Sequence, residues 1–114
     1  EDIVDPDFIF VVGYLDGEPV ACGALRKMDS DVAEVKRMFV KGVFRRKGYS
    51  RQLLIFLEST ARSNGYRILK LETGTKQPES VGLYQSAGYT QIPSYGEYVG
   101  NPFSLCFEKR LTES

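Results

Sequence analysis

The spacing of hydrophobic and polar residues changes along the chain, and each spacing predicts a different kind of element. Phe8 to Tyr14 and Val20 to Arg26 are apolar runs of strand length. Asp16-Gly17 and Glu18-Pro19 stand between them, and this turn signal predicts a β-hairpin.

A third run, Ala33 to Val40, alternates in character and is expected to be a strand. A period of two places successive side chains on opposite faces of a sheet. One face is then expected to carry Val35, Arg37 and Phe39, and the other Glu34, Lys36, Met38 and Val40.

From Ser50 onward the apolar residues recur every three or four positions, which predicts a helix from Ser50 to Ser63 that Asn64-Gly65 ends. Ile68 to Thr73 is then expected to be a strand. Pro78-Glu79 is typical of the first turn of a second helix, which Ala87-Gly88 ends. Further strands are expected near Tyr89 to Ile92 and Ser104 to Lys109, on either side of the aromatic loop from Pro93 to Pro102.

This order of elements predicts an α/β or α+β fold, with a mixed sheet and helices packed on it. Ligands of such sheets bind where strands end and helices begin. The junction between Val40 and Ser50 is therefore the expected binding region.

Composition narrows the class of protein. The 114 residues suit one compact domain, and no apolar run approaches the ~18 residues that a membrane span needs. Fifteen basic and fifteen acidic residues cancel, so no overall charge draws the chain to nucleic acid or to an anionic membrane.

The chain contains no histidine, which excludes Ser-His-Asp and Cys-His machinery and the usual zinc sites, so no metal is expected. Cys22 and Cys106 each lie within an apolar run. They are expected to be buried, reduced thiols, which favours a cytoplasmic location.

Seven basic residues lie within the sixteen positions from Lys36 to Arg51, with no acidic residue among them. This run leads through Gly48 into a helix N-terminus, where free backbone N–H groups and the helix dipole favour phosphate. The run is not a nucleotide P-loop, because Lys47 precedes its glycine. A solvated basic turn is the alternative.

Two motifs in order, Arg45-x-x-Gly48-x-Ser50 after a strand and Leu83-Tyr84-Gln85-Ser86-Ala87-Gly88-Tyr89 on a later helix, resemble the signature of the GNAT family of N-acetyltransferases. The resemblance covers about residues 8 to 110, with Ser50 in place of the usual Gly or Ala. It implies a mostly antiparallel twisted sheet with a splayed parallel strand pair. The family's first strand and helices are not recognised before the hairpin, so residues 1–114 are expected to be one N-terminally truncated acetyltransferase domain.

The resemblance implies acetyl-CoA as co-substrate. In the family the pantetheine arm pairs with a strand and the pyrophosphate rests on loop amides. Gln77 lies where many relatives have an asparagine that contacts the cofactor. The implied cofactor-binding residues are Met38, Phe39, Val40, Arg45, Arg46, Lys47, Gly48, Tyr49, Ser50, Arg51, Gln77 and Tyr84.

The resemblance also implies the chemical roles. Tyr84 is expected to protonate the leaving thiolate, and a backbone N–H near Phe39 to polarise the thioester carbonyl. Glu34, eleven residues before Arg45, is the candidate general base. The alternatives are a core tyrosine at Tyr84 and a strand glutamate at the sheet margin, facing water, at Glu34.

The function that follows is transfer of acetyl from acetyl-CoA to a primary amine of a small molecule, by direct attack in a ternary complex. A non-catalytic acyl-CoA-binding protein of the same fold and a peptide or protein N-acetyltransferase are the alternatives. Phe39, Phe44 and Tyr49 interleave with basic residues as in nucleic-acid-binding modules, but the charge lies in one loop, which disfavours that reading. The loop from Pro93 to Pro102 suits either a small polar acceptor or plain packing, and the sequence leaves a homodimer open.

Overall fold

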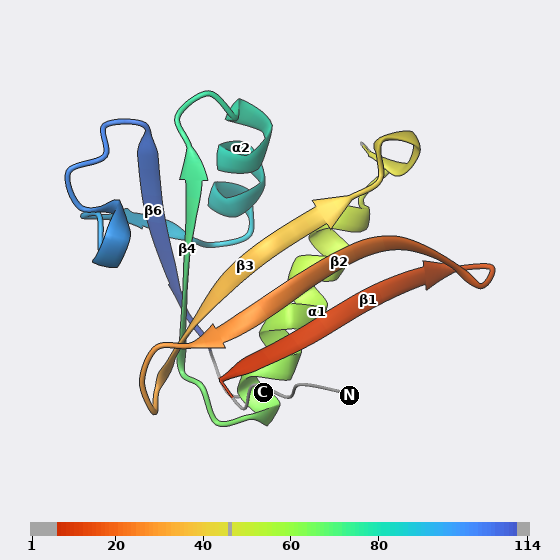
Figure 1. Cartoon of the computed structure of the whole chain (residues 1–114), viewed down its shortest axis with the longest axis horizontal. Helices are drawn as coiled ribbons and strands as arrows, with labels where there is room; N and C mark the ends of the chain where they lie inside the picture. The colour runs from red at the N-terminus through yellow and green to blue at the C-terminus, as the bar shows by residue number, and fades with distance from the viewer. Residues whose placement is uncertain (1–6, 46, 112–114) are drawn as a thin grey trace, which may run out of the picture.

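A computed structural model describes residues 7–45 and 47–111, without the side chain of Arg37. The described residues form six strands, two α-helices and two 3₁₀ turns (Figure 1). The elements in chain order are β1 (Phe8–Leu15), β2 (Glu18–Lys27), β3 (Val32–Val40), η1 (Gly42–Phe44), α1 (Tyr49–Ser63), β4 (Ile68–Gly74), α2 (Pro78–Ser86), β5 (Thr90–Ile92), η2 (Gly96–Tyr98) and β6 (Ser104–Arg110).

The strands form one sheet in the order β1-β2-β3-β4-β6-β5. Every neighbouring pair is antiparallel except β3 and β4, which run parallel. The predicted hairpin is confirmed. Asp16 and Gly17 both have positive φ, 51° and 81°, the conformation that a tight two-residue turn between twisted strands requires.

The parallel pair separates almost at once. The strands β3 and β4 are paired only at Val32–Ile68, Ala33–Leu69 and Glu34–Lys70. Beyond Glu34 the two strands diverge, and a gap opens between them toward their carboxyl ends (Figure 1). The expected mixed sheet with a splayed parallel pair is therefore confirmed.

A β-bulge changes the faces of β3. Cys22 pairs with Phe39 and Ala24 pairs with Lys36, so three steps along β3 oppose two steps along β2. The extra residue reverses the alternation. Val35 and Val40 are both buried in the core, and Met38 packs against it. The alternation predicted for the whole strand is therefore wrong. It placed Val35 on one face of the sheet and Met38 and Val40 on the other face.

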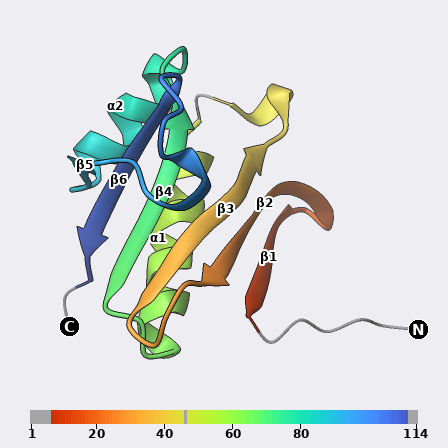
Figure 2. The same ribbon diagram turned by 60° about the vertical axis from the view of Figure 1, so that its left-hand side comes forward.

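Both helices lie on one face of the sheet, and the loop between β5 and β6 crosses the other face (Figure 2). We call the helix-covered side the helix face and the opposite side the loop face. The core lies on the helix face, and its largest fully buried apolar residues are Phe107, Leu25, Leu54, Leu57, Leu69 and Leu71. Neither helix of the described residues is long and apolar enough to cross a membrane.

The close fit between α1 and the sheet depends on a residue without a side chain. A Cβ built at Gly23 would lie 3.0 Å from Cδ1 of Leu57.

The predicted helices are confirmed, and both ends of each helix lie within one residue of the expected position. Cys106 is buried as expected, whereas Cys22 is only half-buried, and neither forms a disulfide within the described residues.

Candidate active site

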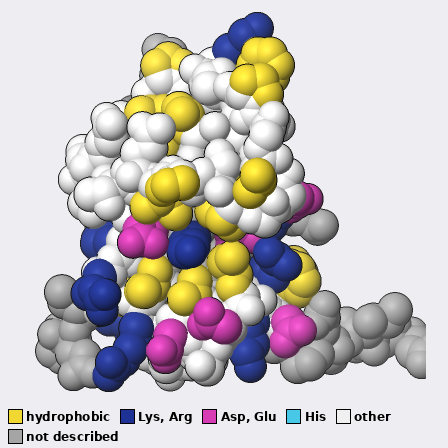
Figure 3. Space-filling view, turned by 90° about the vertical axis from the view of Figure 1, so that its left-hand side faces the viewer, with side chains coloured by type: hydrophobic (Ala, Val, Ile, Leu, Met, Phe, Trp, Pro, Cys, Tyr) yellow, Lys and Arg dark blue, Asp and Glu magenta, His cyan; other side chains and the backbone are white. Residues whose placement is uncertain are grey.

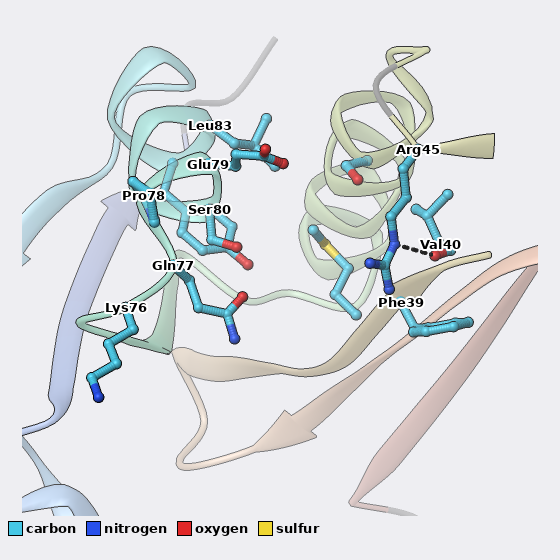
Figure 4. Close-up of a pocket in the computed structure, with 12 residues that line it drawn as sticks. Phe39, Val40, Arg45, Lys76, Gln77, Pro78, Glu79, Ser80 and Leu83 are labelled. Atoms are coloured by element: carbon cyan, nitrogen blue, oxygen red, sulfur yellow. Dashed lines mark hydrogen bonds between the residues drawn. The ribbon is translucent and has the colours of Figure 1, made fainter. Parts of the chain in front are cut away.

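A cavity of about 570 Å³ occupies the gap where β3 and β4 separate. One wall comes from β3 and the start of α1, and the other comes from the β4–α2 turn and α2 (Figure 4). The lining residues are Met38, Phe39, Val40, Arg45, Ser50, Lys76, Gln77, Pro78, Glu79, Ser80, Leu83 and Tyr84. Seven of these were predicted from the sequence to bind a cofactor.

The β3 wall has an open backbone edge. Because pairing with β4 stops at Glu34, the N–H and C=O groups on that edge near Met38 to Val40 have no strand partner from β4. An extended ligand can add to such an edge as another strand would. This arrangement fits the pantetheine contact that the family resemblance implied.

Arg45 is tied to the end of β3. Its Nε donates a hydrogen bond to the carbonyl of Val40 at 3.1 Å, drawn as the dashed line in Figure 4, and its guanidinium lies 5.6 Å from the ring centre of Phe39. These contacts hold a permanent positive charge on the cavity wall.

The start of α1 has the features of an anion-binding helix end. Gly48, the N-cap, has φ of 82° and makes no side-chain capping bond, and the first turn carries no acidic residue. The first helical hydrogen bond runs from Gln52 N–H to the Gly48 carbonyl, so the N–H groups of the first turn have no acceptor within the helix. A Cβ at Gly48 would meet nothing within 4 Å, so glycine is needed for the conformation, not for packing within the chain.

Four of the predicted basic-loop residues do not line the cavity. Lys47 is exposed, and the Arg51 guanidinium donates to Ser86 Oγ on α2. The ring of Tyr49 packs edge-on against Phe44. Gly48 has only backbone at the N-cap of α1, and Arg46 lies outside the described residues.

Tyr84 lines the cavity from α2 and is only 7% exposed. Its ring packs on Tyr89 and Phe107, at 5.9 and 6.2 Å between ring centres. Burial, and to a lesser degree the charge of Glu72, raises the pKa of the Tyr84 hydroxyl. The hydroxyl is therefore protonated near neutral pH and able to donate.

The turn before α2 supplies residues that the sequence did not predict. Gln77, which was predicted, points into the gap (Figure 4). Lys76, Pro78, Glu79, Ser80 and Leu83 join it on the same wall. Their position directly after a strand of the parallel pair was the available signal, because ligands gather at the carboxyl ends of such strands.

Glu34 lies at the base of the gap and does not line the cavity. Its side chain is 1% exposed, so the water-facing alternative is wrong. Oε1 accepts hydrogen bonds from Arg26, and Oε2 accepts hydrogen bonds from the hydroxyls of Tyr95 and Tyr98 in the loop between β5 and β6. No motif or spacing in the sequence pairs Glu34 with residues more than sixty positions away.

The loop face carries both positively and negatively charged side chains. Figure 3 shows Lys and Arg side chains interspersed with Asp and Glu side chains around hydrophobic ones. This face therefore carries charges of both signs.

Comparison with known proteins gives consistent matches. Residues 1–89 match the model of the Acetyltransferase (GNAT) family. The chain is 37% identical over 112 residues to an IAA acetyltransferase of Azospirillum brasilense, covering 97% of this chain and 73% of that protein. It is 30% identical over 113 residues to the uncharacterised N-acetyltransferase YsnE of Bacillus subtilis, covering 97% of this chain and 75% of that protein.

Solved structures share the fold. A Klebsiella pneumoniae protein assigned as an acyl-CoA N-acyltransferase superposes with a TM-score of 0.88 at 31% identity, over 96% of this chain and 77% of that chain. A GNAT acetyltransferase of Elizabethkingia anophelis, solved with acetyl-CoA bound, has a TM-score of 0.81 at 19% identity, over 92% of this chain and 77% of that chain.

Proposed function

Because this chain belongs to the GNAT family of acetyltransferases, we propose that it transfers the acetyl group of acetyl-CoA to a primary amine of a small molecule, by direct attack within a ternary complex. The observation that carries the proposal is the cavity in the β3–β4 gap. It joins an open strand edge, an uncapped helix N-terminus and a protonated tyrosine in one space. The single core of the described residues supports treating the chain as one acetyltransferase domain.

The two ends of acetyl-CoA have matching partners. The pantetheine arm would pair with the backbone of β3 from Met38 to Val40. The pyrophosphate would accept hydrogen bonds from the free N–H groups at the start of α1, with Arg45 and the exposed Lys47 adding positive charge. The acetyl-CoA-bound protein of the same fold supports acetyl-CoA as the co-substrate.

The chemistry requires that an amine lose a proton, that the carbonyl oxygen be stabilised and that a thiolate leave. Tyr84 would donate its proton to the thiolate sulfur, and a backbone N–H near Phe39 would bind the carbonyl oxygen. Glu34, the last residue of β3 that pairs with β4, would receive the proton of the amine.

The loop between β5 and β6 supports a small acceptor. Tyr95 and Tyr98 fasten this loop across the loop face at the level of Glu34, in front of the base of the gap. An amine that approaches from this side meets two aromatic rings at a T-shaped angle, 5.4 Å apart. Such a wall suits a compact amine better than an extended peptide.

The proposal is tested by thiol release from acetyl-CoA in the presence of ethanolamine, tyramine, benzylamine, spermidine and glycinamide, with the acetylated product identified by mass spectrometry. We expect amine-dependent thiol release with at least one amine, and its loss in Gly48→Asp. Saturable acetyl-CoA binding without acetyl transfer to any amine of the panel would contradict the proposal and identify an acyl-CoA-binding protein.

A further inference from the structure

Tyr95 and Tyr98 meet at one oxygen of Glu34. The Tyr95 hydroxyl donates to Oε2 at 2.8 Å, and the Tyr98 hydroxyl donates to the same oxygen at 3.2 Å. Glu34 is the last residue of β3 that pairs with β4, so this meeting point lies where the gap begins. The contacts place two hydroxyls from a distant loop beside the candidate general base, where the gap begins.

The carboxylate of Glu34 is fully occupied. Arg26 donates to Oε1 from Nε at 3.1 Å and from Nη2 at 2.9 Å, while the two tyrosines hold Oε2. A carboxylate offers about four lone-pair positions, and four hydrogen bonds already use them. With a side chain only 1% exposed, Glu34 cannot accept a proton directly from an incoming amine unless one partner leaves.

The two tyrosines differ in what else their hydroxyls contact. The oxygen of Tyr98 accepts a hydrogen bond from Lys36 Nζ at 3.0 Å while its proton points to Glu34. A hydroxyl has one donor and two acceptor positions, so Tyr98 keeps one lone pair for a further donor. Among the described residues the Tyr95 hydroxyl bonds Glu34 alone, and Lys70 lies over its ring, 5.3 Å from the centre.

From this geometry, and resting on the function proposed above, we propose that Tyr98 relays the proton of the acceptor ammonium to Glu34. The ammonium gives a proton to the free lone pair of Tyr98 Oη as Tyr98 gives its own proton to Glu34 Oε2. The products are a neutral amine, a neutral tyrosine and a protonated Glu34, which later releases the proton to solvent. The neutral amine then attacks the thioester, and the second proton of the ammonium replaces the one that Tyr84 gives to the thiolate.

The surroundings of Tyr98 favour a concerted relay. Burial raises the pKa of Tyr98, so its hydroxyl is protonated at rest and cannot be the final base. The Lys36 ammonium stabilises the negative charge that builds on the oxygen during transfer. The titratable and charged groups around Tyr98 are Arg26 on β2, Glu34 and Lys36 on β3, and Tyr95 and Glu97 in its own loop. Next to Tyr95 lie Lys70 on β4 and Cys106 on β6.

Tyr98→Phe and Tyr95→Phe form a matched pair, because each removes one hydroxyl from the same oxygen of Glu34. The measurement is the pH profile of kcat/KM at saturating acetyl-CoA, with the panel amine that wild type acetylates fastest. We expect Tyr98→Phe to lose about 10²-fold at pH values where the amine is protonated, and to approach wild type where the amine is neutral. Tyr95→Phe should keep the wild-type shape of the profile.

A double substitution tests whether Tyr98 and Glu34 act in one path. Tyr98→Phe with Glu34→Gln should lose no more activity than the more damaging single change, because both break the same relay. Acetyl-CoA binding and thermal melting of each variant separate a lost fold from a lost proton path.

The proposal is overturned if the two Tyr→Phe variants have the same pH profile, or if the Tyr98→Phe and Glu34→Gln losses multiply. Both results require an active wild-type enzyme, so they are distinct from failure of the proposed function. If wild type acetylates no amine of the panel, the proposed function fails and the relay fails with it.

Discussion

At the scale of single residues, the environment of Tyr84 matches the needs of a proton donor. In the proposed mechanism the hydroxyl must stay protonated until the thiolate leaves, and burial favours this by raising the pKa of Tyr84. The ring is held by Tyr89 and Phe107, so the position of the hydroxyl does not depend on a hydrogen bond of its own. The same side chain thus serves the core and the cavity.

Tyr84→Phe is expected to lower kcat by roughly 10²–10⁴-fold with little change in acetyl-CoA affinity, since only the donated proton is lost. Tyr89→Phe is the control. The Tyr89 hydroxyl donates to buried Glu58 at 2.9 Å, which Lys109 also contacts at 3.1 Å, so its loss should lower thermal stability and leave kcat in place. Steady-state kinetics and melting curves of both variants check this. Wild-type kcat in Tyr84→Phe would remove Tyr84 from the mechanism.

Some residues of the candidate site could be predicted from the sequence and others could not, for a physical reason. Met38, Gln77 and Tyr84 could be placed because short-range spacing and motif order carry their positions. The bonds of Glu34 to Tyr95 and Tyr98 could not, since they join positions 61 and 64 residues apart through the folded sheet. The aromatic residues of the loop between β5 and β6 do not reveal, from sequence alone, which strand residue they contact.

At the scale of elements, the gap results from two local features of β3. Pairing with β4 stops after three residues, and a bulge against β2 reverses the side-chain alternation before Phe39. The periodicity of the sequence predicted the strand but not the bulge, because a single extra residue leaves the apolar pattern nearly unchanged. The bulge exposes Phe39 near the cavity while Met38 and Val40 pack toward the core.

Two glycines test how closely α1 packs on the sheet. Gly23 lies against Leu57 of α1, whereas Gly82 in α2 has open space around it. Gly23→Val should destabilise the protein by about 1–3 kcal/mol, because a side chain at Gly23 meets Leu57. Gly82→Ala in α2 should stabilise it by about 0.5–1 kcal/mol, since a Cβ there meets nothing within 4 Å and alanine favours the helix. Urea denaturation of both variants measures the difference. A stable Gly23→Val would show that α1 does not need the close approach.

At the scale of the whole molecule, the formal charges sum to zero, but the basic residues are concentrated in one segment of the chain. The fifteen basic and fifteen acidic residues balance, but seven basic residues fall within sixteen positions around the start of α1. The rest of the chain carries eight basic and fifteen acidic residues, so the positive charge around the start of α1 is a local feature. Composition excluded histidine chemistry, and the order of elements predicted the fold class, but the shape of the cavity depended on tertiary packing.

Stability should fall at alkaline pH. Burial raises the pKa of Tyr84 and Tyr89 above the ordinary value of 10.0, so the folded state keeps protons that the unfolded state loses. Their contribution is fully present below about pH 10 and is lost as pH rises further, by about 1.4 kcal/mol per pH unit for each tyrosine. Urea midpoints between pH 8 and 11, with tyrosinate absorbance, check this. A constant midpoint with early tyrosinate formation would contradict the buried environment of these rings.

The most direct test of acetyl-CoA binding in the β3–β4 gap over the start of α1 compares acetyl-CoA with acetyl-pantetheine, which lacks the pyrophosphate, by thermal shift. Acetyl-CoA at one hundred times its dissociation constant should stabilise the wild-type protein by about 2.7 kcal/mol. Acetyl-pantetheine at the same concentration should give a much smaller shift. Gly48→Asp, which strains a residue with φ of 82° and adds negative charge beside the helix end, should abolish the difference between the two compounds. Equal shifts for the two compounds on the wild-type protein would contradict pyrophosphate binding at this site.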